Sequence, residues 1–373
     1  MSEQTEKQPE KVERLMSLDA LRGADMFFIM GFASWITIMC GILPKCGVTE
    51  WLSTQMSHVG WNGLRHHDTI FPLFLFIAGI SFPFSLAKQQ AQGRPAWRIY
   101  LKIVLRGFLL VLLGLIYNGL LQFDFAKLRY CSVLARIGLA WMFAALLFAS
   151  IRKTSILSSI AGVILVGYWL AMWLIPNGPD PFSFENNLVG VIDRALISEQ
   201  HLYQKTFDPE GLFSTLPAIV TAMLGMFTGQ WVRCTKVSGN KKALYILLAG
   251  VAFALIGWLW GFVFPINKKL WSSSFVCAVA GYSLICFSLF YYIIDVRGWR
   301  RWAFFFRVIG MNSITIYMLP RIIDCSRANR FFFGGIIKLF EGDWNKLVAQ
   351  TFYLLTCWLI LYFFYRKKIF LKV

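Results

Sequence analysis

Long apolar runs recur along this sequence, and they restrict what the chain can fold into. A helix of about 20 predominantly apolar residues is long enough to cross the hydrocarbon core of a bilayer. Of the 373 residues, 57% are hydrophobic and only 15% are charged, whereas soluble domains carry about a quarter charged residues. We therefore predict an all-α polytopic membrane protein with about ten transmembrane helices, at residues 16–43, 69–87, 99–121, 130–150, 156–175, 212–232, 244–264, 272–295, 304–320 and 347–365.

The distribution of Lys and Arg predicts how these helices are oriented. Ten spans place both ends of the chain on one side of the membrane, and basic residues are denser in the connections on that side. Cytoplasmic segments carry such an excess, so we expect both termini to be cytoplasmic. Long extracytoplasmic loops are then expected at 44–66, 176–211 and 321–346. The expected division of the chain is a cytoplasmic tail at 1–14, a single transmembrane domain at 15–365 and a cytoplasmic tail at 366–373.

The net charge of +18 does not indicate nucleic-acid binding, because most basic residues lie in the flanking segments that the topology already explains. The eight cysteines form no CxxC or Cys/His spacing, so no metal site is expected. Cys46 and Cys325 both fall in extracytoplasmic loops, where they either pair or remain two unrelated thiols. Two small-xxx-small patterns, GMFTG at 225–229 and GWLWG at 257–261, favour close helix packing within the bundle or between protomers.

Ionisable residues inside the predicted spans are functional candidates, since burying a charge in a membrane is costly. Asp19, Arg22 and Asp25 follow one another at spacings of three, so they share a helix face and either form a structural triplet or serve a site. Arg22, Arg106 and Arg307 lie on three spans at a similar cytoplasmic depth. Guanidinium groups bind phosphates in bidentate fashion, so these arginines suit an anionic ligand that enters from the cytoplasm. Arg136 lies in the opposite half of the membrane.

Three of the four histidines lie within the stretch SHVGWNGLRHHDTIFP, just ahead of the second span. His66 and His67 at a helix start fit interfacial anchors, with Asp68 as the helix cap. His58 has no span to anchor and is the stronger functional candidate. A cationic site on one side and a histidine with a carboxylate on the other fit two classes. One is an enzyme that uses a phosphate-bearing cytosolic donor; the other is an amino-sugar or anion transporter with a proton-relay histidine.

Six motifs occur in order between about Ser17 and Tyr317: LDALRG, HVGWNGLxxxDxIFPxFxFIxGIS, RYCSVLARIG, FDPEGLFSTLPAIVTAMLGMFTG, FPINKKLWSSSFV and GMNSITIY. Together they resemble the heparan-α-glucosaminide N-acetyltransferase family and its bacterial relatives. The resemblance implies a transmembrane N-acetyltransferase that moves an acetyl group from cytosolic acetyl-CoA to the amine of a glucosamine-type sugar on the far side. The large luminal domain of the lysosomal pattern is missing, which implies a bacterial inner-membrane protein and leaves the acceptor open. The resemblance also favours a homodimer.

The resemblance maps catalytic roles onto individual residues. The histidine of the H-x-x-W-N-G motif falls on His58, which would act as general base or as acetyl carrier. Asp68 would orient the imidazole or cap the helix. Asn312 of GMNS and Asn62 are candidate donors to the thioester oxygen, or interhelical hydrogen-bonding residues.

Further residues are assigned to the two substrates. Asp208 and Glu210 of the DPEG motif would hold the acceptor, and Trp61 would stack on its sugar ring. The acetyl-CoA phosphates would be held by the arginines within the spans, and the donor-binding set is Asp19, Arg22, Arg106, Arg136 and Arg307.

Overall fold

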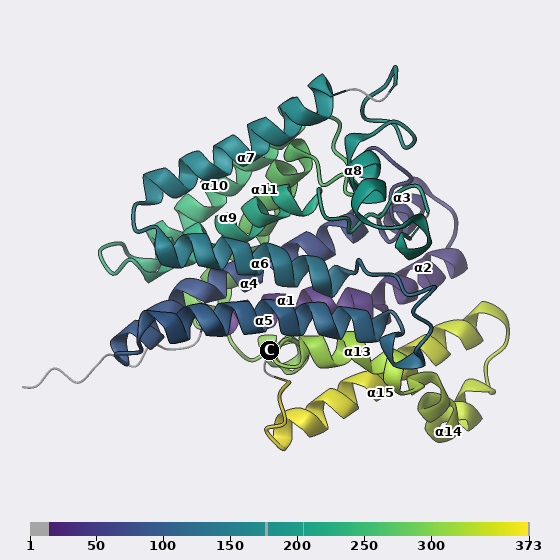
Figure 1. The fold of residues 1–373 in the computed structure, drawn as a ribbon. Helices are drawn as coiled ribbons and strands as arrows, with labels where there is room; N and C mark the ends of the chain where they lie inside the picture. Colours follow the sequence, from purple (N-terminus) through teal and green to yellow (C-terminus); the bar gives the residue numbers. More distant parts are fainter. Residues whose placement is uncertain (1–14, 176–177, 204, 372–373) are drawn as a thin grey trace, which may run out of the picture.

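The computed structural model describes residues 15–175, 178–203 and 205–371. The predicted tail at 1–14 and the last two residues of the tail at 366–373 lie outside this part of the chain. The described residues form helices and no strand (Figure 1). Within these described ranges, nine helical segments are long and apolar enough to cross a membrane, and a bent helix pair makes a tenth candidate. The all-helical, multi-pass architecture predicted from the apolar runs is therefore confirmed.

The observed segments match the predicted spans to within a few residues at most boundaries. The first is continuous over Met16–Ile42 and combines α1 (Met16–Phe27), the π-helical η1 (Phe28–Phe32) and α2 (Ala33–Ile42). The others are α4 (His66–Ala91), α5 (Ala96–Tyr117), α6 (Val133–Ser150), α7 (Thr154–Leu174), α9 (Thr215–Arg233), α10 (Gly239–Trp260), α11 (Ser273–Phe290) with η4 (Tyr291–Val296), α12 (Ala303–Gly310) with α13 (Ser313–Ile322), and α15 (Gly342–Arg366).

The first and ninth spans are irregular, and they pack against each other. In the first span, Gly31 adopts a φ of 134°, a conformation open to glycine, and a π-helical turn surrounds it. In the ninth, α12 and α13 meet at an angle of 63°. The backbones of α1 and α12 approach closely where Gly23 faces Gly310, since a side chain at either position would collide with the opposite backbone.

The three segments predicted as long loops contain short helices. These are α3 (Gly47–Gln55), α8 (Leu188–Leu196) and α14 (Cys325–Ile337), with the 3₁₀ turn η3 (Glu199–His201) after α8; a further 3₁₀ turn, η2 (Leu120–Gln122), follows α5. Helix α8 is fixed by the Asn187 side chain, which accepts a hydrogen bond from the Gly190 amide at 2.8 Å. At nine residues, α8 is too short for a membrane-span pattern to reveal it.

The core of the bundle lies where α4 and α9 cross behind α6 (Figure 1). The backbones of these helices touch at Gly225 and Gly229 of α9, which face Phe76 and Ile80 of α4. Gly257 of α10 likewise packs against α11. The two small-xxx-small patterns thus serve packing within the bundle. Cys46 is exposed and Cys325 is buried, and both are free thiols.

Candidate functional site

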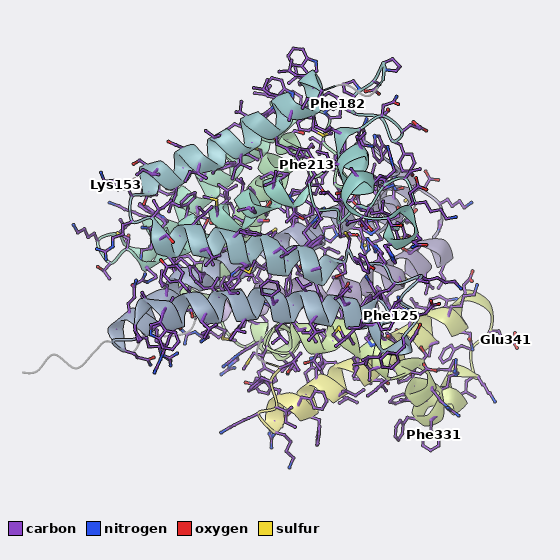
Figure 2. All side chains as sticks on the ribbon, in the orientation of Figure 1. Phe125, Lys153, Phe182, Phe213, Phe331 and Glu341 are labelled. Atoms are coloured by element: carbon purple, nitrogen blue, oxygen red, sulfur yellow. The ribbon has the colours of Figure 1, made fainter. Side chains whose placement is uncertain are left out.

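A cavity of about 620 Å³ lies at the start of α4, and we call it the His58 cavity. It brings together four of the residues predicted from the sequence: His58, Trp61, Asp68 and Glu210. It lies at the same end of the bundle as α3 and α8, opposite the end marked by Lys153 in Figure 2. Its remaining lining residues are Val59, Gly63, Tyr117, Arg129, Val133, Tyr203, Pro209, Lys268, Lys269 and Trp271.

His58, Asp68 and Lys268 form a compact charged group in this cavity. The His58 Nδ1 atom lies 2.7 Å from Asp68 Oδ1, and the Lys268 Nζ atom lies 3.5 Å from the same oxygen and 3.2 Å from Nδ1. Asp68 is 2% exposed, whereas the His58 side chain is 55% exposed. The carboxylate therefore fixes the ring from behind while the ring remains accessible to the cavity.

Asp68 combines the two roles that the sequence left open. Its Oδ2 atom accepts hydrogen bonds from the backbone N–H of Arg65 and of Val59, both at 3.2 Å. Arg65 is the residue that precedes α4, so Asp68 caps this helix from its third position. Its other oxygen holds His58. A carboxylate that accepts the Nδ1–H bond leaves Nε2 as the basic atom of the imidazole.

A second charged group crosses the cavity from the DPEG segment. Arg129 donates to Asp208 from Nε at 2.8 Å and from Nη2 at 2.6 Å, and it also pairs with Glu210. Asp208 is completely buried and accepts further hydrogen bonds from the amides of Tyr203 and Glu210. Although burial disfavours the charged form, the two carboxylates raise the pKa of Arg129 above its ordinary value. Glu210 lines the cavity, while Asp208 supports Arg129 from behind.

Trp61 forms one wall of the cavity. Its indole N–H donates to the Phe182 carbonyl at 2.8 Å, and its ring packs edge-on against Phe184 and Phe207. The Lys269 ammonium lies 5.6 Å from the ring centroid. Asn62 follows in sequence but does not line the cavity, because its Oδ1 atom accepts a hydrogen bond from Asn267 at 3.1 Å.

His66 and His67 occupy the first turn of α4 outside the cavity lining. The His66 ring packs against Phe28 with centroids 4.5 Å apart, and its backbone N–H donates to Gln55. The His67 ring lies 4.6 Å from that of His58. Both residues thus anchor the start of α4 to its neighbours.

A second cavity, of about 300 Å³, contains two of the predicted donor-binding arginines, and we call it the Arg106 cavity. Arg22 bonds Ser81 at 3.3 Å and pairs with Asp19 at 3.6 Å. The Arg106 guanidinium lies 4.1 Å from the centroid of the Trp141 ring, and its Nε is buried without a hydrogen-bond partner. The third member of the sequence triplet, Asp25, is buried with Oδ2 unpartnered.

The remaining predicted residues lie elsewhere. Arg307 and Asp19 line a separate cavity of about 440 Å³, the Arg307 cavity, together with Asp295 and Arg300. The Nε atom of Arg307 is buried and unpartnered. Arg136 lines none of these three cavities: it is buried, bonds the Gly211 carbonyl at 3.0 Å and pairs with Ser214.

Asn312 lies at the bend between α12 and α13, and both polar atoms of its amide are buried without partners. Its sequence neighbours Met311 and Ser313 line the Arg106 cavity. The structure thus associates Asn312 with the Arg106 cavity and not with the lining of the His58 cavity.

The His58 and Arg106 cavities are both lined by α4, α5 and α6. On α4, Asp68 lines the first, and Phe74 and Ala78 line the second. On α5, Tyr117 lines the first and Arg106 lines the second. Tyr117 stacks on Tyr317 of α13 with ring centroids 4.8 Å apart. Tyr317 itself lines neither cavity, but Ser313 and Ile314, one turn earlier on α13, line the Arg106 cavity.

Lys268 and Arg129 are the principal site residues to which the sequence assigned no role. Both lie within quoted motifs, FPINKKLW and RYCS, but they are far in sequence from the residues they contact. Lys268 is 210 positions from His58, and Arg129 is 79 positions from Asp208. The predicted topology already accounts for basic residues in loops, so the sequence gives no separate signal for these two. Their pairing becomes visible only in the folded structure.

The fold and these cavities define the class: a multi-pass helical membrane protein with a histidine–carboxylate pocket at one end and buried arginines deeper in the bundle. A family described as "Domain of unknown function (DUF5009)" matches residues 14–198. The human heparan-alpha-glucosaminide N-acetyltransferase is 30% identical over 96% of this chain, and that of the mouse is 27% identical over 98%. The matches cover 60% and 62% of those two proteins, so the chain spans about three fifths of their length. The chain is thus similar in sequence to the heparan-alpha-glucosaminide N-acetyltransferases along nearly its whole length.

Proposed function

We propose that this protein is a transmembrane N-acetyltransferase that moves an acetyl group from cytosolic acetyl-CoA to the amine of a glucosamine-type sugar on the extracytoplasmic side. The single observation that carries the proposal is the His58–Asp68–Lys268 group, which lines a cavity large enough for a sugar. The names of the curated relatives support the reaction. The charges within the spans suit a transporter equally well, but these names favour a transferase.

Acetyl transfer to an amine forms an N–C bond, breaks the C–S bond of the thioester and releases one proton from the nitrogen. In this proposal the His58 Nε2 atom takes that proton as the amine attacks, and Asp68 stabilises the imidazolium that results. The thiolate leaves as the tetrahedral centre collapses. In the alternative route, Nε2 attacks the thioester itself and carries the acetyl group to the amine.

Lys268 acts on the same group through its charge. Burial lowers the pKa of this lysine, and the charge of Asp68 opposes that effect. When Lys268 is charged, it stabilises the Asp68 carboxylate but repels a proton on His58.

The acceptor would bind between Glu210 and Trp61. Glu210 offers a carboxylate on the cavity wall for the amine or hydroxyls of the sugar, and Trp61 offers an aromatic surface for its ring. Asp208 is completely buried and fully hydrogen-bonded, so its proposed role is to hold Arg129 and Glu210 in place. The role of Asn62 is to position the Trp61 loop through Asn267.

The donor would occupy the Arg106 cavity and extend to the Arg307 cavity. Its anionic groups suit Arg22, Arg106 and Arg307, and the buried, unpartnered Nε atoms of the latter two fit a ligand that supplies acceptors. Asp19 would orient Arg22 through their ion pair. The Asn312 amide is likewise unpartnered and suits the polar groups of a thioester arm.

The spacing along α4 supports passage of the acetyl group between the cavities. Asp68 and Ala78 are ten residues apart, which corresponds to about 15 Å of helix. An extended arm covers such a distance, so the acetyl group would cross while the nucleotide part of the donor remains at the Arg106 end. The Tyr117–Tyr317 pair would have to admit this arm. Arg136 would contribute by fixing the segment that follows Glu210, through Gly211 and Ser214.

The remaining proposals concern the setting of the enzyme. Residues 15–365 would form one transmembrane domain in a bacterial inner membrane, with both termini in the cytoplasm and the α3, α8 and α14 segments outside. The density of basic residues on the opposite set of connections supports this orientation. The proposed oligomer is a homodimer, by resemblance to the family.

The test is acetyl transfer from labelled acetyl-CoA to glucosamine by the purified protein in detergent, with His58→Ala run beside it. The expected result is product from the wild type and none from the variant. Tight acetyl-CoA binding without product would identify a wrong acceptor. Absence of binding as well would overturn the transferase proposal and direct attention to transport.

A further inference from the structure

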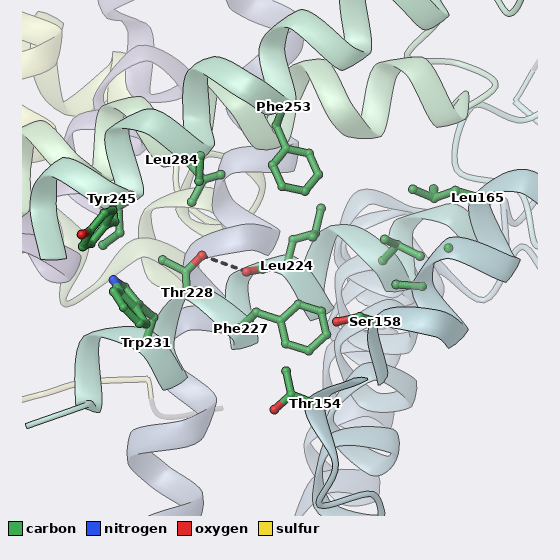
Figure 3. Close-up of a pocket in the computed structure, with 15 residues that line it drawn as sticks. Thr154, Ser158, Leu165, Leu224, Phe227, Thr228, Trp231, Tyr245, Phe253 and Leu284 are labelled. Atoms are coloured by element: carbon green, nitrogen blue, oxygen red, sulfur yellow. Dashed lines mark hydrogen bonds between the residues drawn. The ribbon is translucent and has the colours of Figure 1, made fainter. Parts of the chain in front are cut away.

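An apolar groove of about 590 Å³ runs along α9 between α7 and α10, away from the cavities described above (Figure 3). Phe227 of α9 and Phe253 of α10 flank it from opposite sides in this view. The groove is lined by Thr154, Ser158, Ala161, Gly162, Leu165, Val220, Leu224, Phe227, Thr228, Trp231, Tyr245, Ile246, Ala249, Phe253 and Leu284.

The sequence explains why this groove is open. Its walls on α7 and on α9 each extend over twelve positions at helical spacing, from Thr154 to Leu165 and from Val220 to Trp231, which corresponds to about 16 Å. Small side chains on α7 leave room there, and a side chain added at Gly162 would meet no atom within 4 Å. The groove is therefore long, narrow and apolar.

The groove lies at the perimeter of the bundle. Its α7 wall adjoins Val163, which is 71% exposed, and its α10 wall adjoins Leu248, which is 54% exposed. Exposed apolar side chains on membrane spans face lipid, so the groove opens towards acyl chains. Trp231 and Tyr245 lie near one end, as is typical of aromatic residues at a membrane interface.

At that end the groove adjoins a polar cavity of about 730 Å³, which we call the Arg233 cavity. Thr154 lines both. The Arg233 cavity contains Arg152 and Arg233, and Gln230 and the hydrogen-bonded hydroxyls of Tyr100 and Ser150 add polar groups. Within the described residues, neither arginine has a carboxylate in ion-pair distance. Two uncompensated guanidinium groups suit a phosphate.

We propose that the groove and the Arg233 cavity together bind one anionic phospholipid. One acyl chain fills the groove, and the phosphate of the headgroup lies between Arg152 and Arg233. The continuity of an apolar slot with a cationic pocket at the membrane interface matches the two parts of such a molecule. A soluble organic phosphate would leave the groove empty.

This site is independent of the proposed acetyl transfer. Pro83, Leu86, Ala87 and Gln90 of α4 line the Arg233 cavity, whereas Asp68 lies near the opposite end of the same helix. The separation from Asp68 to Pro83 is fifteen residues, or about 22 Å along the axis. None of the lining residues belongs to the His58, Arg106 or Arg307 cavities.

The test is lipid binding to delipidated protein in detergent, followed by native mass spectrometry and by thermal unfolding. The probes are dioleoyl phosphatidylglycerol, dioleoyl phosphatidylcholine and inorganic phosphate. The expected result is one bound phosphatidylglycerol per chain and a raised Tm, with weaker effects of phosphatidylcholine and none of phosphate. Equal binding of the two lipids, or an equal Tm rise with phosphate alone, would overturn the proposal.

Two variants probe the two parts of the site. The double variant Arg152→Gln with Arg233→Gln should weaken phosphatidylglycerol binding by about tenfold to thirtyfold, since each basic residue at a membrane surface adds a modest attraction. Arg98→Gln is the matched control, because Arg98 is an exposed arginine outside the lining. Gly162→Leu places a side chain in open space and should block the acyl chain without disturbing the fold. Unchanged binding in both test variants would contradict the proposal.

Discussion

The His58 cavity and the Arg106 cavity differ in whether their ionisable side chains are paired. In the first, the charged side chains bind one another: His58 and Lys268 contact Asp68, and Arg129 contacts Glu210. In the second, and in the separate Arg307 cavity, Arg106 and Arg307 each leave a buried Nε without a partner. A buried polar atom without a partner is costly. On the proposed function, this difference fits a preorganised reactive pocket in the first region and a site that an anionic ligand would complete in the second.

The largest expected effect is the loss of transfer on removing the proposed base. His58→Ala should lower kcat by about 10²–10⁴-fold, the usual contribution of a general base, while acetyl-CoA still binds. Both quantities are measured with labelled acetyl-CoA. The matched control is His67→Gln, which alters the neighbouring histidine outside the cavity lining and should change kcat by less than tenfold. Normal turnover in His58→Ala would contradict the assignment of the reaction to the His58 cavity.

The next effect is on stability. Arg129→Leu leaves the completely buried Asp208 without its cationic partner, and breaking such a pair costs about 3–5 kcal/mol. Thermal unfolding in detergent should show a large fall in Tm. Lys127→Ala, two residues earlier, removes a side chain that is 86% exposed and should leave Tm unchanged. Similar Tm values for the two variants would mean that the paired charges of the His58 cavity are not structural.

Arginines of the second region should affect binding more than stability. Arg106→Ala and Arg307→Ala each remove charge-assisted hydrogen bonds to the donor and should weaken acetyl-CoA binding by about tenfold to a hundredfold. The affinity for the sugar should hardly change. Binding is measured separately for each substrate by calorimetry. Equal losses for both substrates would contradict a donor site at these arginines.

Asp193 of α8 is an exception to the pairing near the His58 cavity, and its effect depends on pH. Its Oδ2 atom is buried without a partner, and burial raises the pKa of this carboxyl to about 6. The unfolded chain, with a pKa of about 3.9, releases the proton at lower pH than the folded protein. Stability contributed by this group therefore falls as the pH rises from about 4 to 6.

Asp193→Asn removes this pH dependence and can retain the hydrogen bond to the Leu212 amide. The variant should gain up to about 3 kcal/mol relative to the wild type between pH 4 and pH 7. The measurement is the difference in Tm between the two proteins across this range. A constant difference would show that Asp193 is ionised in the folded protein throughout.

The spans were predictable from sequence because each apolar run is a local property of about 20 residues. The break in the ninth span was not, since GMNS interrupts neither the hydropathy nor the length of the run. His58 and Asp68 could be proposed as site residues from the sequence because they lie within one short stretch. Lys268 and Arg129 could not, because folding brings them to partners that are distant in sequence. From the sequence, Asp68 could either orient His58 or cap α4. In the structure one carboxylate does both, because each of its oxygens makes one of these hydrogen bonds.

Because one carboxylate serves both the helix start and the histidine, Asp68 constrains how the sequence of this pocket can diverge. Asp68 begins α4 with one oxygen and holds His58 with the other. A substitution of Asp68 that alters the histidine therefore also weakens the start of α4, one of the two most buried of the described spans. On the proposed function, new acceptor preferences are more accessible through Trp61, Tyr203 and Glu210, which line the same cavity and do not start a helix. On the proposed function, the base and its carboxylate are therefore constrained together, while the residues that would contact the acceptor can vary without affecting the start of a helix.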